Sequence, residues 1–167
     1  MRVPGTTSAG GVLGSAPARA AFALEAGAEA LRADKVDARI GDDEHGLNLS
    51  GEATYSPADG LDARLQATSL DLDRFRAAYR AGEVAQGAPP LVARVRLSAD
   101  SATLGGETLA NVALDLAHRP GAAAHVALDA GLPGRTRLHY DGAVDARADL
   151  ALDGEAKVET RDAAKLA

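Results

Sequence analysis

A two-residue alternation of apolar and polar side chains runs through most of this chain and constrains its fold more than any other feature. The alternation is clearest between Ser101 and Val144, where turn residues at 118–121 and 131–134 separate three alternating segments. Because successive side chains of a strand point to opposite faces, this alternation gathers the apolar side chains on one face. These segments therefore predict an antiparallel meander with one apolar and one polar face. In the first segment, the apolar positions are Ala110, Val112, Leu114 and Leu116.

The same alternation recurs elsewhere in the chain, at 22–26, 36–40, 47–55, 61–67, 91–97 and 148–158. Residues 28–34 fit a short helix, on the propensities of Ala, Glu, Leu and Arg, or a strand. We favour a strand, since a helix of this length is marginal alone. We predict a mainly-β fold, an amphipathic antiparallel meander or curved sheet of roughly 8–10 strands with one or two short helices.

The alternation ends at Ser69, and a short helix is predicted at about 71–81. Asp71 can cap its first turn, and apolar residues follow at helical spacing. The chain then divides into parts: a flexible lead-in (1–20) with at most a strand at its end, a first β unit (21–86), a Pro/Gly linker (87–90) and a second β unit (91–167). The second unit ends in a truncated helix from Ala163, which Asp162 can cap, so the order strand, Asp, helix occurs twice and predicts an internal repeat.

The composition limits both the core and the partners. Three tyrosines and two phenylalanines are the only aromatic residues, and cysteine is absent, so the core must consist of Ala, Leu and Val. Alanine buries little apolar surface, at about 25 cal/mol per Å², so we expect a weakly stabilised sheet. The net charge of −6, with Lys and Arg scattered among Asp and Glu, argues against a nucleic-acid partner.

No pattern in the sequence predicts catalysis or a bound metal or cofactor. His118 falls in a turn, and His125 and His139 fall on the polar face, but no spacing makes metal ligands converge there. The acidic turn at 42–44 lacks the ligand spacing of an EF-hand loop, so a solvated turn is the simpler interpretation. Phosphate-binding glycine loops and Gly-x-Ser-x-Gly turns do not occur. We therefore predict a protein that is not an enzyme, with no catalytic, cofactor-binding or metal-binding residues.

The meander also resembles a known family. Residues 102–106 (ATLGG), 109–116 (LANVALDL) and 131–134 (GLPG), followed by a Gly-containing strand, resemble the repeating β region of AsmA-like envelope proteins of Gram-negative bacteria. Ala67–Phe75 (ATSLDLDRF) resembles the point in that family where a long strand runs into a short helix. The resemblance extends from Phe22 to the C-terminus.

This resemblance implies a section of a periplasmic protein, anchored in the inner membrane when full-length, with a role in outer-membrane biogenesis and phospholipid transport. AsmA-like proteins usually begin with a transmembrane helix, and no such helix or export signal is visible here, so we expect a fragment. The family is similar to bridge-like lipid carriers, whose curved sheet presents an apolar face to phospholipid acyl chains. The expected lipid-facing residues are Leu47, Leu49, Leu61, Leu65, Val95, Leu97, Val112, Leu114, Leu116, Val126, Leu128, Leu138, Leu150 and Leu152.

Two other functions stay open on the sequence. A structural or adhesive β-repeat module would have the same alternation, but its apolar face would be a sealed core with no lipid role. An enzyme using the carboxylates ranks last, because it needs a compact pocket with converging acids. Coverage of both faces of the sheet would favour the module, and a long open trough would favour lipid handling.

Overall fold

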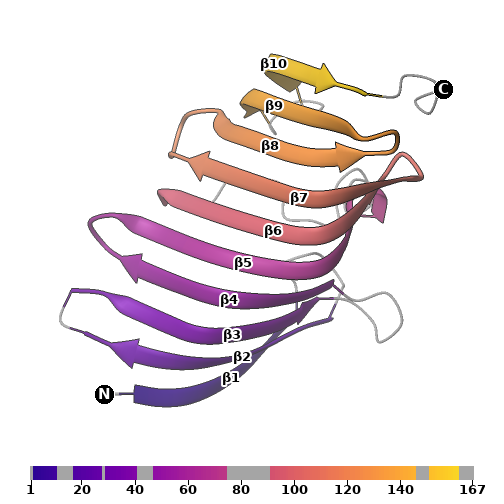
Figure 1. Cartoon of the computed structure of the whole chain (residues 1–167). Helices are drawn as coiled ribbons and strands as arrows, with labels where there is room; N and C mark the ends of the chain where they lie inside the picture. The colour runs from indigo at the N-terminus through magenta and orange to yellow at the C-terminus, as the bar shows by residue number, and fades with distance from the viewer. Residues whose placement is uncertain are drawn as a thin grey trace.

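The computed structural model describes residues 2–10, 17–27, 29–40, 47–74, 91–145 and 151–161, and it places ten strands among them in one curved sheet (Figure 1). The strands lie side by side in chain order, with β1 and β10 at the two edges. They are β1 (Arg2–Gly10), β2 (Pro17–Ala26), β3 (Leu31–Ile40), β4 (Leu47–Ser56), β5 (Gly60–Asp71), β6 (Ala93–Leu104), β7 (Glu107–His118), β8 (Ala124–Leu132), β9 (Thr136–Asp145) and β10 (Ala151–Glu159). The predicted mainly-β curved sheet is confirmed.

One pair of neighbouring strands departs from the expected antiparallel arrangement. β5 and β6 run parallel, with Leu61 opposite Ala93 and Leu65 opposite Leu97. All the other neighbouring pairs are antiparallel. Parallel neighbours need a crossover connection of a dozen or more residues, and the chain between Asp71 and Ala93 has that length. Because β5 and β6 are paired, the sheet continues across the predicted boundary between the two β units.

The crossover begins with the predicted helix. Residues 72–74 are helical, and the amide of Arg74 donates a hydrogen bond of 2.8 Å to Oδ1 of Asp71, which caps the first turn as expected. Residues 75–90 lie outside the described residues, so the rest of the helix and the linker at 87–90 stay predictions. The second predicted helix, from Ala163, also lies outside them.

The N-terminal part of the chain is more regular than expected. Arg2–Gly10 forms β1 and pairs with β2, although no strand is predicted before the end of the lead-in. Strand pairing is made by backbone hydrogen bonds, so it does not require the side-chain alternation that this stretch lacks. The amide of Gly27 donates to the carbonyl of Ala30 at 2.9 Å, and β3 begins at Leu31, so the preferred strand at 28–34 is confirmed for 31–34, whereas residues 29 and 30 belong to the turn before it.

The alternation of buried and exposed side chains skips one position in each of three strands. In β5, Ala67 and Leu70 are both buried, and the aligned residues of β6 and β7 repeat this spacing of three. In β7 the skip falls at Asn111, whose φ of 50° accompanies a register shift against β8. Ala110 is therefore exposed and Leu109 buried, so the prediction that Ala110 lies on the apolar face is wrong.

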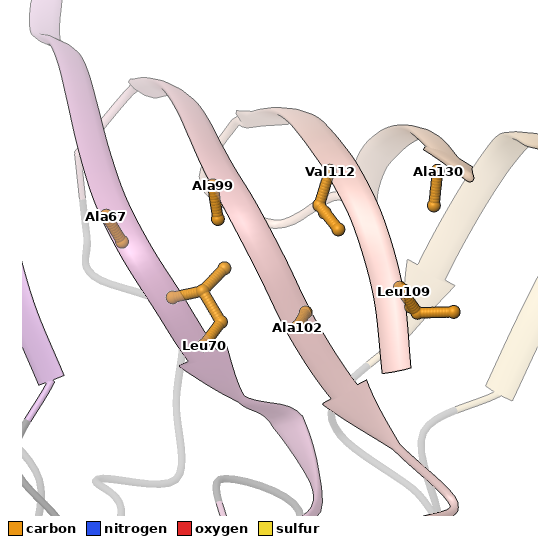
Figure 2. Close-up of a cluster of buried hydrophobic side chains, with 7 residues drawn as sticks. All are labelled: Ala67, Leu70, Ala99, Ala102, Leu109, Val112 and Ala130. Carbon is orange, nitrogen blue, oxygen red and sulfur yellow. The ribbon is translucent and has the colours of Figure 1, made fainter. Parts of the chain in front are cut away.

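Seven buried side chains of β5, β6, β7 and β8 form one small hydrophobic cluster. Figure 2 shows them on one side of β5, β6, β7 and β8, gathered beneath the curve of the strands. Its members are Ala67, Leu70, Ala99, Ala102, Leu109, Val112 and Ala130. Four of these seven are alanine, so the core is as thin as the composition predicts.

Candidate functional site

The predicted lipid-facing residues share one face of the sheet, which we call the apolar face. Directly opposite residues of paired strands point to the same side, so the register carries the face from strand to strand. Leu65 lies opposite Leu97, and Leu97 lies opposite Leu114. The row that contains them, which we call the central row, is Gly51, Leu65, Leu97, Leu114, Leu128, Tyr140 and Ala156. It crosses the sheet from β4 to β10 without a charged residue.

The remaining predicted residues lie in rows beside the central row. Val95, Leu116 and Val126 are aligned on one side of it, with Leu61 one step further along β5. Leu47, Leu49, Val112 and Leu138 lie on the other side. Leu152 is paired with Val144 in the backbone register, and Leu150 lies outside the described residues. The structure therefore places on one surface all the candidates whose side chains it describes.

Burial varies across the apolar face. The buried cluster around Leu70 is shielded from solvent by partly buried leucines that pack against it. One of them is Leu72, at the start of the crossover, and the others are Leu47, Leu49, Leu97, Leu128 and Leu132. Elsewhere on this face large side chains are exposed, with 43% of Leu31 on β3, 39% of Tyr55 on β4 and 56% of Val158 on β10 accessible to solvent. Among the described strands, substantial contacts join only sheet neighbours, so no second sheet packs on this face.

Two buried polar residues lie at the margins of the apolar face. His118 is 5% exposed and is the last residue of β7, opposite Ala93, so the predictions that it belongs to the turn at 118–121 and is solvated are wrong. Thr136 is 2% exposed, and its hydroxyl lies 2.8 Å from the hydroxyl of Thr160. The alternation in β7 continues from Leu116 to His118, although Arg119, Pro120 and Gly121 predicted a turn that already included His118. His118 therefore lies on the apolar face.

The opposite face, which we call the polar face, carries exposed ion pairs. Glu52 lies 3.4 Å from Arg32 and 3.3 Å from Arg64, and Arg96 lies 3.0 Å from Asp62. The pKa of Arg32 is raised, chiefly by a hydrogen bond from its guanidinium to Asp34 and then by the negative charges of Asp34 and Glu52. A depression of about 780 Å³ on this face mixes cations and acids along its lining, so its charge selects neither an anion nor a cation. Its charged lining residues are Asp34, Lys35, Glu52, Arg64, Arg96, Asp115 and Asp129.

The histidines of the polar face form two separate pairs with aspartates across β8 and β9. His139 Nδ1 lies 2.9 Å from Asp129, and His125 Nε2 lies 3.3 Å from Asp141. The predicted position of both histidines on the polar face is confirmed by the register. In the described part of the chain no group of three or more His, Asp or Glu residues could hold a metal ion. The acidic turn at 42–44 lies outside that part.

Asp73 has a structural role that sequence reasoning missed. Its carboxylate accepts hydrogen bonds from the amides of Gly105 and Gly106, at 2.7 and 2.9 Å. Both glycines have positive φ, 64° and 80°, as a two-residue hairpin turn between β6 and β7 requires. In the sequence, the adjacent glycines Gly105 and Gly106 could have indicated this contact, because a tight turn built on two glycines leaves backbone amides pointing outward, where an acceptor can bind them.

The comparisons with known proteins give no relatives. The chain matches no family model, no curated protein and no solved structure. Among the described residues, no helix has both the length and the apolar character needed to span a bilayer.

Proposed function

We propose that the apolar face binds phospholipid acyl chains and forms a section of a hydrophobic groove in an AsmA-like protein of the Gram-negative envelope. The observation that carries the proposal is the central row together with the rows on either side of it. These three rows contain no Asp, Glu, Lys or Arg from β4 to β9, and they run across the strands rather than along them.

The dimensions of the face support this role. Strands in a sheet lie about 4.8 Å apart, so the three charge-free rows from β4 to β9 are about 24 Å long. Large contiguous apolar patches on soluble proteins commonly mark a surface that meets another molecule. Aliphatic side chains offer an acyl chain dispersion contacts without demanding hydrogen bonds, and Leu, Val and Ala supply most of the surface.

The polar face supports the same proposal from the other side. Its ion pairs keep about half of their side-chain surface in water, for example 59% for Arg64 and 43% for Glu52. A sheet with one wetted face and one face free of charge in its central rows suits a protein that shields lipid tails from an aqueous compartment. We place that compartment in the periplasm, in a protein anchored in the inner membrane and active in phospholipid transport and outer-membrane biogenesis.

Binding of a fluorescent fatty acid analogue, and of phospholipids extracted and identified by mass spectrometry, tests the proposal. Leu114→Asp puts a charge into the central row, whereas Ala113→Asp puts the same charge on the exposed polar face of the same strand. We expect the first variant to lose binding and the second to keep it. Far-UV circular dichroism checks that both retain the sheet. Equal binding by the two variants, or no binding by the unmodified chain, contradicts the proposal.

A structural or adhesive module is the second candidate, and the closed cluster favours it. Leu70, Ala102 and Leu109 are 6%, 1% and 2% exposed, as in an ordinary core, and Leu72 packs against them. If the whole face were sealed in this way, cysteines introduced into the central row, as in Leu97→Cys and Leu128→Cys, would react with a thiol-specific label only after unfolding. In an open groove they would react in the folded protein, and added fatty acid would block the reaction.

A further inference from the structure

The outer edge of β10 is open in the described part of the chain. β10 pairs with β9 alone, and its residues Asp153–Glu159 are all exposed. Val158 is 56% exposed, the most of the large hydrophobic residues described as exposed. A long strand with unpaired backbone groups is a template for pairing with another chain. The opposite edge is less suited to pairing, because Pro4 in β1 has no amide hydrogen to donate.

The charges along β10 make it complementary to itself in one register. On the polar face they read Asp153, Glu155, Lys157 and Glu159. In an antiparallel pair of identical strands centred on Val158, Lys157 lies opposite the partner's Glu159. This contact occurs twice by symmetry, and each time it joins opposite charges.

The neighbouring registers are worse. Centring the pair on Lys157 puts two lysines together, and centring it on Glu155 puts two glutamates together. Centring it on Ala156 pairs Glu155 with the partner's Lys157 but also places Asp153 against the partner's Glu159, so the attraction and the repulsion offset each other. Like charges directly opposite each other are destabilising, so the register centred on Val158 is favoured. In this register the opposite charges of Lys157 and Glu159 both lie within β10, which ends at Glu159.

We propose that a second copy of this chain pairs with the first along β10, antiparallel, with Val158 opposite the partner's Val158. The two-fold axis is then perpendicular to the sheet, so the two sheets join into one. Both apolar faces lie on the same side of it, and the exposed side chains of Val158 bury each other. The proposal does not depend on lipid binding, because it uses only the edge of the sheet.

Cysteine crosslinking tests the register, and the natural absence of cysteine makes each introduced thiol unique. With Val158→Cys, the two thiols face each other at a Cα separation of about 4.5–5.5 Å, within reach of a disulfide. Ala156→Cys is the matched control on the same face, since the two copies of residue 156 lie four residues apart along the strands, about 13 Å. Glu155→Cys tests the register centred on Glu155. We expect a disulfide-linked dimer at position 158 alone, and a dimer at 155 or 156 instead overturns the proposal.

Charge reversal tests the interface without any crosslink. Sedimentation equilibrium of the full chain in lipid-free buffer should show a monomer–dimer equilibrium. Lys157→Glu or Glu159→Lys alone creates two like-charge contacts and should weaken the dimer about tenfold, whereas the double variant restores opposite charges and should recover it. A chain that stays monomeric at all concentrations, or a double variant no better than the single ones, overturns the proposal.

Discussion

The carboxylate of Asp73 holds the hairpin at Gly105, because Oδ1 of Asp73 accepts the amide hydrogen bond of Gly105 at 2.7 Å. Asp73 lies just after the end of β5, and Gly105 lies in the turn between β6 and β7. The contact therefore joins the start of the crossover to the next hairpin along the sheet. Gly106 donates to the other oxygen at 2.9 Å, so both outward amides of the turn are satisfied by one side chain.

Replacing Asp73 should destabilise this corner of the sheet. Asp73→Ala removes two charge-assisted hydrogen bonds, and water can replace part of them because both glycines are exposed. We expect a loss of about 1–3 kcal/mol in the free energy of unfolding, measured by urea denaturation. Asp100→Ala on the exposed polar face of β6 is the control and should change stability by less than about 0.5 kcal/mol. Equal losses in the two variants would show that the contact adds nothing.

Leu109 should be among the most sensitive positions of the core. It is 2% exposed and packs in the cluster of Figure 2, so Leu109→Ala should cost about 2–5 kcal/mol through lost burial and the cavity left behind. Leu104, at the other side of the same hairpin, is 38% exposed, and Leu104→Ala should cost much less. Thermal unfolding followed by circular dichroism compares the two. A smaller effect at Leu109 than at Leu104 would contradict the assignment of the core.

The alternation was sufficient to predict the apolar face, because a period of two translates directly into side-chain direction. Where the alternation skips a residue, prediction failed. At Asn111 a positive φ shifts the faces, and Ala110 moves to the exposed side while Leu109 becomes buried. Asn tolerates this conformation better than most residues, but a single Asn does not distinguish a bulge from an ordinary strand position.

Contacts between distant parts of the chain were the second limit. The parallel pairing of Leu65 with Leu97 depends on where the chain returns after the crossover, and local patterns do not contain that information. The burial of His118 depends on Ala93, its partner in β6, for the same reason. For the candidate site, the sequence predicted which residues share a face. Which of these residues lie opposite each other on neighbouring strands is known only from the register of the sheet.

The ion pairs of the polar face should add little to stability. Glu52 lies within 3.4 Å of Arg32 and within 3.3 Å of Arg64, but all three side chains are 43–59% exposed. Glu52→Gln should therefore lower the free energy of unfolding by at most about 1 kcal/mol, and the difference should shrink in high salt. Arg32 keeps the hydrogen bond to Asp34, the largest cause of its raised pKa. Urea denaturation at low and high salt measures both effects, and a large loss that salt leaves unchanged would contradict this account.

The two glycines that face each other across β9 and β10 should control the attachment of the edge strand. Gly142 lies opposite Gly154, and a Cβ on Gly142 would lie 2.5 Å from the carbonyl oxygen of Asp153 and 2.6 Å from Cα of Gly154. Because these are backbone atoms, Gly142→Ala must push β10 away from β9, at a cost of about 1–3 kcal/mol.

Gly27→Ala is the control for this substitution, because its nearest atom would be the carbonyl oxygen of Ala30 at an ordinary 3.4 Å. Amide hydrogen exchange measures the effect locally. We expect the amides that bond β9 to β10 to exchange faster in Gly142→Ala, while those of β6 and β7 stay unchanged. Unchanged exchange between β9 and β10 would contradict the close approach of the two glycines. If the edge of β10 joins two copies of the chain, the same variant should also weaken the dimer, because the strand that carries Val158 is no longer held in the plane of the sheet.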